Sequence, residues 1–440
     1  MMFASLDLIY RKYNESTGVS TDTRSLEEGN IFFALRGPSF NGNQYAQRAL
    51  EAGASSVVID EPEYQSGKDC LLVEDTLQSL QQLAQLHRRT FSIPLLGITG
   101  SNGKTTTKEL IKFVLSNRYK VYATEGNYNN HIGVPLTLLK MTEELEFCIV
   151  EMGTNQPGDI AELCVIAEPN YALITNIGDA HLEKLISRRG VYEEKSSLFE
   201  SVEMRHGAQH VFLNMSDEYL RKRQNSNAAL PYIQYDAQGK YSSSLKLSVK
   251  EGHQYLRLDV NINGEAYELN SQLTGSYNVE NVAAAITVGI HFGIEIEEII
   301  DSIESYRPQN MRSEFIEGER NLILLDAYNA NPTSMMSSIS SFIKQNDPSR
   351  TILILGDMLE LGDEALAFHR DILKFIERQS LSNVFLIGEI FLELSSEFPY
   401  SFYRDAEEMK ALGLLQSIQD KTILIKGSRG IKLEKIIDQL

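Results

Sequence analysis

A short loop at residues 99–106 carries the residue types that bind the phosphates of a nucleotide. Its backbone N–H groups can surround phosphate oxygens, the Lys104 ammonium can reach the β- and γ-phosphates, and the Thr105 hydroxyl can coordinate Mg²⁺. An apolar run at residues 93–98 precedes the loop and a helix pattern at residues 107–115 follows it. The sequence therefore predicts a nucleoside triphosphate site whose loop residues are Thr99, Gly100, Ser101, Asn102, Gly103, Lys104, Thr105 and Thr106.

This loop departs from the strict phosphate-loop pattern at one position. The pattern places glycine five residues before Gly103, where this chain has Ile98, flanked by Gly97 and Gly100. A chance Gly-Lys-Thr is the alternative interpretation. The strand before the loop and the helix after it favour a variant phosphate loop.

Two further polar side chains follow predicted strands, at the strand ends where parallel sheets bind ligands. Glu151 comes directly after the strand at residues 147–150, and its carboxylate can hold Mg²⁺. His181 lies in the loop after the strand at residues 171–174 and can contact a metal or a phosphate. A solvated glutamate and a structural histidine are the alternatives.

Lys195 lies inside a predicted helix at residues 190–200. On the residues alone it is interpreted as a surface lysine, because long charged side chains on helices usually face water. The residues by themselves therefore assign it no chemical role.

Length and charge restrict the class of protein. At 440 residues the chain is too long for one hydrophobic core and predicts about three domains. The formal net charge of −19 argues against a surface that follows nucleic-acid phosphates, so we expect small-molecule partners and no nucleic acid. The three cysteines lack metal-ligand spacing and are typical of reduced core residues. No apolar run reaches the roughly 20 residues that span a bilayer, so we expect a cytoplasmic protein without membrane insertion.

The chain divides into three blocks in which strands alternate with helices, which predicts an α/β protein. The first block is a small α/β unit, and its predicted strands and helices are residues 31–35, 56–59, 43–52 and 76–89. The second contains the phosphate loop, and its further strands, typical of a mainly parallel sheet, are residues 147–150, 171–174 and 211–213.

The remaining segments differ in pattern. Residues 241–273 alternate between apolar and polar types around Asn263-Gly264, which predicts an antiparallel hairpin on the second block. The third block begins near residue 307 and predicts a second doubly wound sheet, with strands at residues 322–325, 351–355, 384–387 and 422–425.

Together these residues resemble the bacterial ATP-dependent Mur ligases of peptidoglycan precursor synthesis over nearly the whole chain. The resemblance implies three domains. They are a small N-terminal α/β domain for the UDP-sugar substrate at residues 1–90, a central phosphate-loop ATPase domain with a mainly parallel sheet at residues 91–308, and a C-terminal Rossmann-like α/β domain at residues 309–440.

The family resemblance also implies roles for single residues. Glu151 and His181 match its metal ligands, and Lys195 lies 14 residues after His181, where the family has a carbamylated lysine. Residues 275–284 resemble a motif that opens a helix near the nucleotide. The residues that the resemblance places at ATP are Asn278, Asn281, Arg312 and Asp326.

Within the family, four segments resemble the members that join D-alanyl-D-alanine to UDP-N-acetylmuramoyl-tripeptide; they are residues 125–139, 326–334, 356–362 and 426–429. Residues 21–24 and 29–42 resemble the domain that holds the UDP-sugar. The substrate-binding residues implied in this way are Thr23, Arg24, Asn41, Asn127, Asn129, Asn130, Asn329, Asn331, Lys426, Ser428 and Arg429.

The activity implied by the resemblance is amide ligation through an acyl phosphate, with ATP and two Mg²⁺ ions as cofactors and a monomeric enzyme. Its metal ligands would be Thr105, Glu151, His181 and the carbamate of Lys195, and its catalytic residues Lys104, His181, Lys195 and Arg312. Another Mur-type ligase and a folylpolyglutamate synthase-like ligase are the enzymatic alternatives. A nucleotide-sensing scaffold is a third, while a switch GTPase lacks its guanine-reading Asn-Lys-x-Asp motif here.

Overall fold

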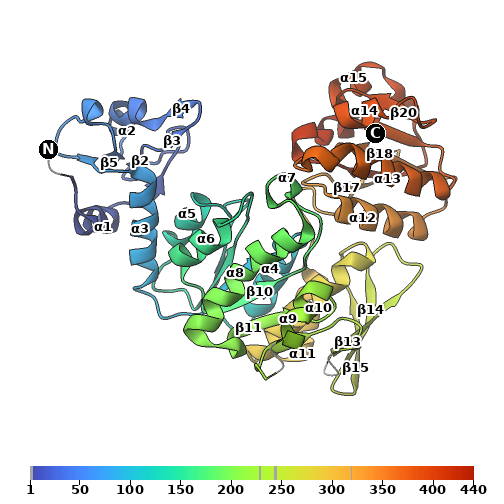
Figure 1. Ribbon diagram of the computed structural model, residues 1–440, viewed down its shortest axis with the longest axis horizontal. Helices are drawn as coiled ribbons and strands as arrows, with labels where there is room; N and C mark the ends of the chain where they lie inside the picture. Colours follow the sequence, from blue (N-terminus) through green and yellow to red (C-terminus); the bar gives the residue numbers. More distant parts are fainter. Residues whose placement is uncertain (1–2, 227–228, 242–244, 319) are drawn as a thin grey trace.

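The computed structural model describes residues 3–226, 229–241, 245–318 and 320–440. Figure 1 shows three α/β domains, with the N-terminal domain in blue, the central domain mostly in green and the C-terminal domain in orange and red. The predicted α/β class is confirmed, because each domain is built around a parallel or mainly parallel sheet. Among the described residues, none of the helices is both long and apolar enough to cross a membrane.

The N-terminal domain has a four-stranded parallel sheet in the order β1-β2-β5-β6. Its strands are β1 (Val19–Ser20), β2 (Ile31–Phe33), β5 (Ser56–Ile59) and β6 (Cys70–Leu72), with a small pair β3 (Arg36–Gly37) and β4 (Phe40–Asn41). Its helices are α1 (Leu6–Asn14), α2 (Ala46–Glu51) and α3 (Thr76–Arg88).

The helix predicted at residues 43–52 divides into two parts. A 3-10 turn spans Gly42–Tyr45, and α2 begins only at Ala46. The Asn41 side chain accepts a hydrogen bond from the Asn43 N–H, and this local cap favours the tight turn over a first α-helical turn.

Helix α3 joins the first two domains. Its side chains Leu80 and Leu83 belong to one apolar cluster with Val134 of α5 (Gly133–Leu138) and Leu163 of α6 (Asp159–Ala167). Figure 1 shows α3 beside these two helices, below the rest of the N-terminal domain. The N-terminal domain is therefore held against the central domain by a shared apolar core.

The central domain contains a six-stranded sheet in the order β12-β11-β10-β7-β9-β8, and every neighbouring pair is parallel. Its strands are β7 (Leu95–Thr99), β8 (Val121–Ala123), β9 (Phe147–Glu151), β10 (Tyr171–Ile174), β11 (Val211–Asn214) and β12 (Ile233–Tyr235). The other helices are α4 (Lys104–Leu115), α7 (Leu182–Leu185), α8 (Arg188–His206), α9 (Glu218–Ser226), α10 (Val279–His291) and α11 (Ile296–Ser305). Since β7 lies between β9 and β10, the loops after these strands meet at one edge, where such sheets bind ligands.

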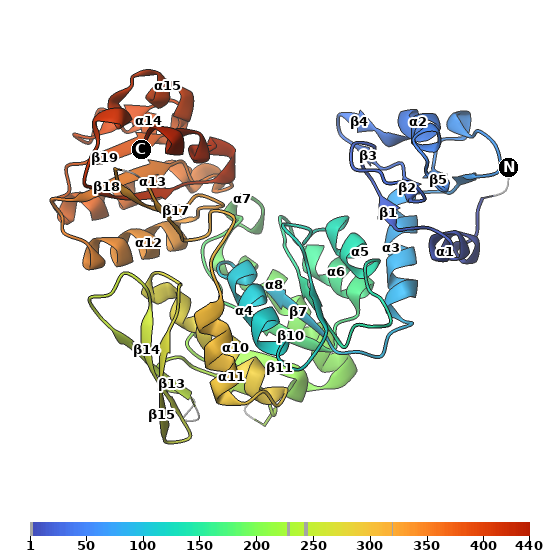
Figure 2. The ribbon, with the colours of Figure 1, turned by 180° about the vertical axis from the view of Figure 1, so that it is seen from behind.

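The alternating segment forms an antiparallel sheet of β13 (Leu245–Lys250), β14 (Arg257–Ile262) and β15 (Glu265–Asn270). The predicted turn lies between β14 and β15, where Asn263 and Gly264 both have positive φ. Of the predicted range 241–273, residues 242–244 lie outside the described residues. Figure 2 shows this sheet beside α10 and α11.

The C-terminal domain has a six-stranded sheet in the order β16-β17-β21-β18-β19-β20, parallel except for β16. Its strands are β16 (Glu314–Glu317), β17 (Leu322–Asp326), β18 (Thr351–Gly356), β19 (Val384–Ile387), β20 (Ser401–Tyr403) and β21 (Thr422–Lys426). Its helices are α12 (Pro332–Gln345), α13 (Ala365–Arg378), α14 (Glu389–Glu393) and α15 (Ala406–Ala411). Its two apolar clusters contain no residue of the other domains.

Candidate active site

A cavity of about 780 Å³ lies between the central and C-terminal domains. Loops that follow β7, β9, β10 and β17 line it, as expected for parallel strands. The predicted site residues that line it are Ser101, Asn102, Gly103, Lys104, Thr105, Thr106, Asn127, Asn129, Asn130, Glu151, His181, Asn278, Asn281, Arg312, Asp326, Asn329, Asn331 and Lys426. Those outside its lining are Thr23, Arg24, Asn41, Thr99, Gly100, Lys195, Ser428 and Arg429.

Two glycines give the phosphate loop its shape. Gly103 has φ +80° directly before α4, and a side chain at Gly103 would collide with the Asn281 amide. A side chain at Gly100 would collide with the Thr175 hydroxyl. The loop therefore leads directly into α4, whose first N–H groups can bind phosphate oxygens, whereas the Ser101 and Asn102 N–H groups donate to Asn176.

Asn281 and Asn278 support this loop from α10. The Thr107 hydroxyl donates to Asn281 Oδ1 at 3.0 Å, and Asn281 Nδ2 donates to Asn278 Oδ1 at 2.7 Å. The two asparagines thus form a polar link between the phosphate loop and the helix-opening motif, and both border the cavity.

A carboxylate, a hydroxyl and a lysine border the cavity, and a second, buried lysine lies behind them. Thr105 Oγ1 donates to Glu151 Oε2 at 2.8 Å, and Asn129 Nδ2 donates to Glu151 Oε1 at 2.9 Å. The Lys108 ammonium, which sequence reasoning missed, lies 3.9 Å from Glu151 Oε2. Lys104 Nζ donates to the Gly100 carbonyl at 2.7 Å, and burial lowers the pKa of Lys104.

Lys195 is not a surface lysine. Its exposed fraction is 0%, because α8 packs against β7 and β10 with this face inward. Its Nζ has no hydrogen-bond partner among the residues that the structure describes. Burial first, and then the nearby Lys104 charge, lower the pKa of Lys195 well below its ordinary value. Burial therefore disfavours the charged ammonium form of Lys195.

His181 faces the C-terminal domain. Its Nδ1 lies 2.7 Å from Oε2 of Glu360, which follows β18 and also borders the cavity. Figures 1 and 2 both show α7, which His181 precedes, next to the C-terminal domain. In the sequence, residues 356–362 only resemble a segment of the family. No motif among the neighbouring residues identifies Glu360 as a site residue.

The C-terminal domain contributes a cation held by an aromatic ring. The Arg312 guanidinium carbon lies 3.7 Å from the centre of the Tyr328 ring, and Arg312 Nε has no hydrogen-bond partner within the described part of the chain. Asp326 pairs with Lys426 at 2.6 Å, and Asn331 Nδ2 donates to Asn102 Oδ1 of the phosphate loop at 2.7 Å. The two domains thus meet directly at the phosphate loop.

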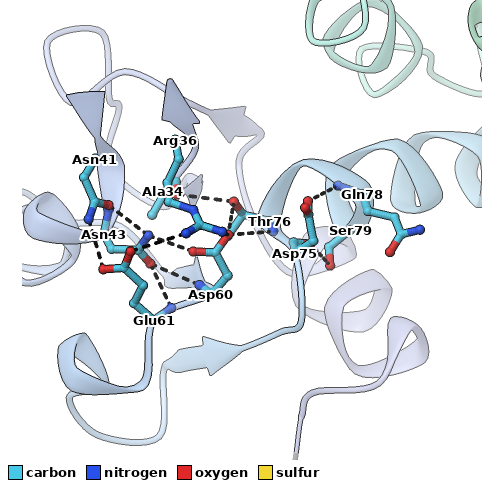
Figure 3. A network of polar contacts seen from close by, with 10 residues as sticks. All are labelled: Ala34, Arg36, Asn41, Asn43, Asp60, Glu61, Asp75, Thr76, Gln78 and Ser79. Carbon is cyan, nitrogen blue, oxygen red and sulfur yellow. Dashed lines mark hydrogen bonds and ion pairs between the residues drawn. The ribbon is translucent and has the colours of Figure 1, made fainter. Parts of the chain in front are cut away.

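The predicted substrate residues of the N-terminal domain lie apart from this cavity. Asn41 borders a second cavity of about 390 Å³ together with Arg36 and the stacked rings of Phe40 and Tyr45. Figure 3 shows Asn41 and Arg36 joined to the carboxylates of Asp60 and Glu61.

Three other predicted substrate residues make contacts outside both cavities. Arg24 pairs with Asp22 on the surface. Ser428 Oγ accepts a hydrogen bond from the Leu359 N–H, and Arg429 contacts Met311.

Metal binding would depend on mixed ligands. Among the described residues, no group of three or more histidine, cysteine, aspartate and glutamate side chains is placed to hold a metal ion. The Thr105 hydroxyl beside the Glu151 carboxylate supplies hard oxygen atoms instead, which suit Mg²⁺ bound partly by water and substrate phosphates.

Known proteins are similar to this chain along nearly its whole length. Three family models match it: "Mur ligase family, catalytic domain" at residues 15–88, "Mur ligase middle domain" at residues 98–289 and "Mur ligase, glutamate ligase domain" at residues 311–429. The UDP-N-acetylmuramoyl-tripeptide–D-alanyl-D-alanine ligase of Bacillus subtilis is 35% identical over 433 residues, which cover 96% of this chain and 93% of the relative.

Two solved structures are similar along almost their full length. A MurF structure from Acinetobacter baumannii has a TM-score of 0.84 at 26% identity and covers 96% of this chain and 92% of that one. The MurF ligase of Thermotoga maritima in complex with ADP has a TM-score of 0.82 at 26% identity, with coverage of 96% and 97%. This chain belongs to the Mur ligase family of ATP-dependent ligases.

Proposed function

We propose that this enzyme joins D-alanyl-D-alanine to UDP-N-acetylmuramoyl-tripeptide, with hydrolysis of ATP to ADP and phosphate. The relative from Bacillus subtilis is named for these two substrates. The observation that carries the proposal is the cavity in which the phosphate loop and Glu151 of one domain face Arg312 and Asp326 of another.

The chemistry follows from the substrates. A carboxylate does not react with an amine at neutral pH, because its oxygen is a poor leaving group, so the tripeptide carboxylate must first accept the γ-phosphoryl group of ATP. The amine then attacks the acyl phosphate and phosphate leaves. Lys104, the loop N–H groups and Arg312 supply positive charge where charge develops on the phosphoryl group.

Two magnesium sites are part of the proposal. Thr105 and Glu151 would hold one ion, and His181 with a modified Lys195 would hold the other. When bound, Mg²⁺ neutralises phosphate charge and gathers oxygen atoms of both reactants. The fit is supported by the paired hydroxyl and carboxylate of Thr105 and Glu151.

The proposed modification of Lys195 is a carbamate. The neutral amine nitrogen forms a bond to the carbon of CO₂ and loses one proton to water, so a neutral amine becomes an anion with two hard oxygen atoms. A buried Nζ without a hydrogen-bond partner among the described residues supports this proposal, because neither the ammonium nor the free amine is satisfied there.

The substrate would extend between the two cavities. We propose that the cavity beside Asn41, with the half-exposed Arg36 and the stacked aromatic rings, holds the nucleotide end. The substrate roles of Thr23, Arg24, Ser428 and Arg429 also stay proposals. The same holds for the domain limits at residues 1–90, 91–308 and 309–440, for a monomeric state and for a cytoplasmic location.

A substrate panel tests the proposed reaction. We expect stoichiometric phosphate release, and a product mass increased by one D-alanyl-D-alanine unit, only when ATP, UDP-N-acetylmuramoyl-tripeptide and D-alanyl-D-alanine are all present. Ligation of a single amino acid to the UDP-dipeptide would assign another Mur-type activity instead. Glutamate addition to a folate would assign the folylpolyglutamate alternative.

A further inference from the structure

We propose that Glu360 is a positioning residue that orients His181 when the C-terminal domain lies against the central domain. The inference rests on the proposed function, in which His181 is a site residue. It assigns a role to the segment at residues 356–362, which that function leaves without one.

The contact itself is specific. His181 Nδ1 lies 2.7 Å from Glu360 Oε2, a distance at which the Nδ1–H can donate to the carboxylate, and this contact lowers the pKa of Glu360. A neutral imidazole then has its lone pair on Nε2, the atom left to act as a ligand or acceptor. A carboxylate behind a ligating histidine fixes both its tautomer and its ring direction.

The backbone brings the two side chains together. His181 has φ +54° and Glu360 has φ +65°, a left-handed conformation that is unfavourable at a non-glycine residue. The Glu183 N–H donates to the Glu360 carbonyl at 3.3 Å. At Gly362, an added Cβ would lie only 3.2 Å from Glu183 Cα, so the two loops touch.

The segment that carries Glu360 is fixed to its own domain. The Leu359 N–H donates to Ser428 Oγ at 2.9 Å, and the Met358 N–H donates to His369 Nε2 at 3.0 Å. Asp357 in turn accepts from the N–H groups of Ile390 and Phe391. Glu360 therefore moves with the C-terminal domain, and its bond to His181 exists only while the domains are close.

Site assembly is thereby coupled to domain approach. His181 belongs to the central domain and Glu360 belongs to the C-terminal domain. A separate hydrogen bond, from Asn331 to Asn102, joins the same two domains at the phosphate loop. When the C-terminal domain moves away, the His181 ring loses the partner that selects its tautomer.

Two variants and one control test this role. Glu360→Ala removes the acceptor, whereas Glu360→Gln keeps an oxygen that can accept the Nδ1–H. Asp363→Ala is the control, because Asp363 is an exposed residue of the same segment. We expect Glu360→Ala to lower kcat roughly 10- to 100-fold, Glu360→Gln to recover most of that loss, and Asp363→Ala to match the unmodified enzyme.

A double-mutant cycle separates positioning from domain stability. If Glu360 acts through His181, Glu360→Ala will cause no further loss in a His181→Ala background. Losses that multiply in the double variant would overturn the proposal, as would full activity of Glu360→Ala.

A readout without catalysis distinguishes this proposal from the proposed reaction. Histidine-selective ¹⁵N NMR with a non-hydrolysable ATP analogue reports the tautomer of His181, assigned with His181→Gln. We expect the Nδ1–H form in the unmodified enzyme and a changed spectrum in Glu360→Ala. An unchanged His181 signal would overturn the positioning role. If D-alanyl-D-alanine is not ligated, the proposed function fails while this spectrum still decides the role of Glu360.

Discussion

At the scale of single residues, burial decides what two lysines can do. Burial lowers the pKa of both Lys104 and Lys195, and the Lys104 charge lowers the pKa of Lys195 further. Lys104 borders the cavity and can meet phosphate, whereas Lys195 lies beneath it without a hydrogen-bond partner among the described residues. The two lysines therefore differ in their surroundings: Lys104 borders the cavity, and Lys195 is fully buried.

The proposed carbamate of Lys195 predicts chemical rescue. Lys195→Ala should lose most ligation activity because the second metal site loses its oxygen ligand, and acetate or formate should partly restore it by occupying the vacated space. Phosphate release at increasing acid concentration measures both effects. Lys104→Ala is the matched control, since a short acid cannot replace its positive charge. Full activity of Lys195→Ala without added acid would contradict the metal-ligand role.

Lys104 is expected to act on phosphate charge. Lys104→Ala should lower kcat at least ~10²-fold, the scale at which one preorganised charge stabiliser is lost. Lys112→Ala is the control, because Lys112 lies two turns further along α4 and does not border the cavity. Circular dichroism should show both variants folded. Near-normal ligation by Lys104→Ala would mean that the loop does not bind phosphate as proposed.

At the scale of elements, the start of α10 carries two asparagines that support the phosphate loop and a buried glutamate whose ionisation destabilises the folded chain. Asn278 and Asn281 support the phosphate loop, while Glu280 between them points into the protein with Oε2 unbonded among the described residues. Burial raises the pKa of Glu280 to about 7, and the charges of Asp236 and Asp217 act in the same direction. Ionised Glu280 is therefore disfavoured in the folded chain.

This shift predicts a pH-dependent stability. Because the folded pKa lies above the unfolded value, the contribution of neutral Glu280 is fully present below about pH 4.5 and is lost as the pH rises through about 7. The full shift corresponds to at most about 3 kcal/mol. Glu280→Gln should therefore raise the urea midpoint at pH 8 relative to the unmodified chain and change it little at pH 5.

The exposed Glu298 on α11 provides the control. Glu298→Gln should leave the difference in urea midpoint between pH 5 and pH 8 the same as in the unmodified chain. An equal effect of Glu280→Gln at pH 5 and pH 8 would show that the Glu280 carboxyl titrates normally.

At the scale of the whole molecule, the domains are joined in two different ways. The N-terminal domain shares an apolar cluster with the central domain through α3. The C-terminal domain has separate apolar clusters and meets the central domain through polar contacts, among them those of Asn331 and Glu360, and through the Tyr255–Phe315 ring pair. Polar interfaces of this kind separate at lower cost than shared cores, so the C-terminal domain is the one expected to move.

A shortened chain tests this division. A chain that ends at Tyr306 keeps the three apolar clusters of the first two domains, so it should fold and bind nucleotide through the phosphate loop. It should not ligate, because Arg312 and Asp326 are missing. Calorimetric titration with ADP measures binding, and product analysis measures ligation. Product formation at a normal rate would show that the C-terminal domain is not needed.

Features that depend on residues adjacent in the chain could be predicted from the amino-acid sequence. The phosphate loop depends on glycines and a lysine that are adjacent in the chain, and the Asn263-Gly264 turn depends on two residues that accept positive φ. Apolar periodicity likewise predicted the three α/β domains and the parallel sheets. The prediction of a single helix at residues 43–52 was wrong, because the Asn41 side chain caps a 3-10 turn there.

Features that depend on packing between distant segments could not be predicted from the amino-acid sequence and required the folded chain. Lys195 is buried because α8 lies on the central sheet, a placement that its helical neighbours do not encode. Glu360 reaches His181, and Arg312 rests on Tyr328, because a whole domain lies against the phosphate loop. Burial, charge and hydrogen bonding at these positions depend on three-dimensional surroundings, so the residue types alone left their roles open.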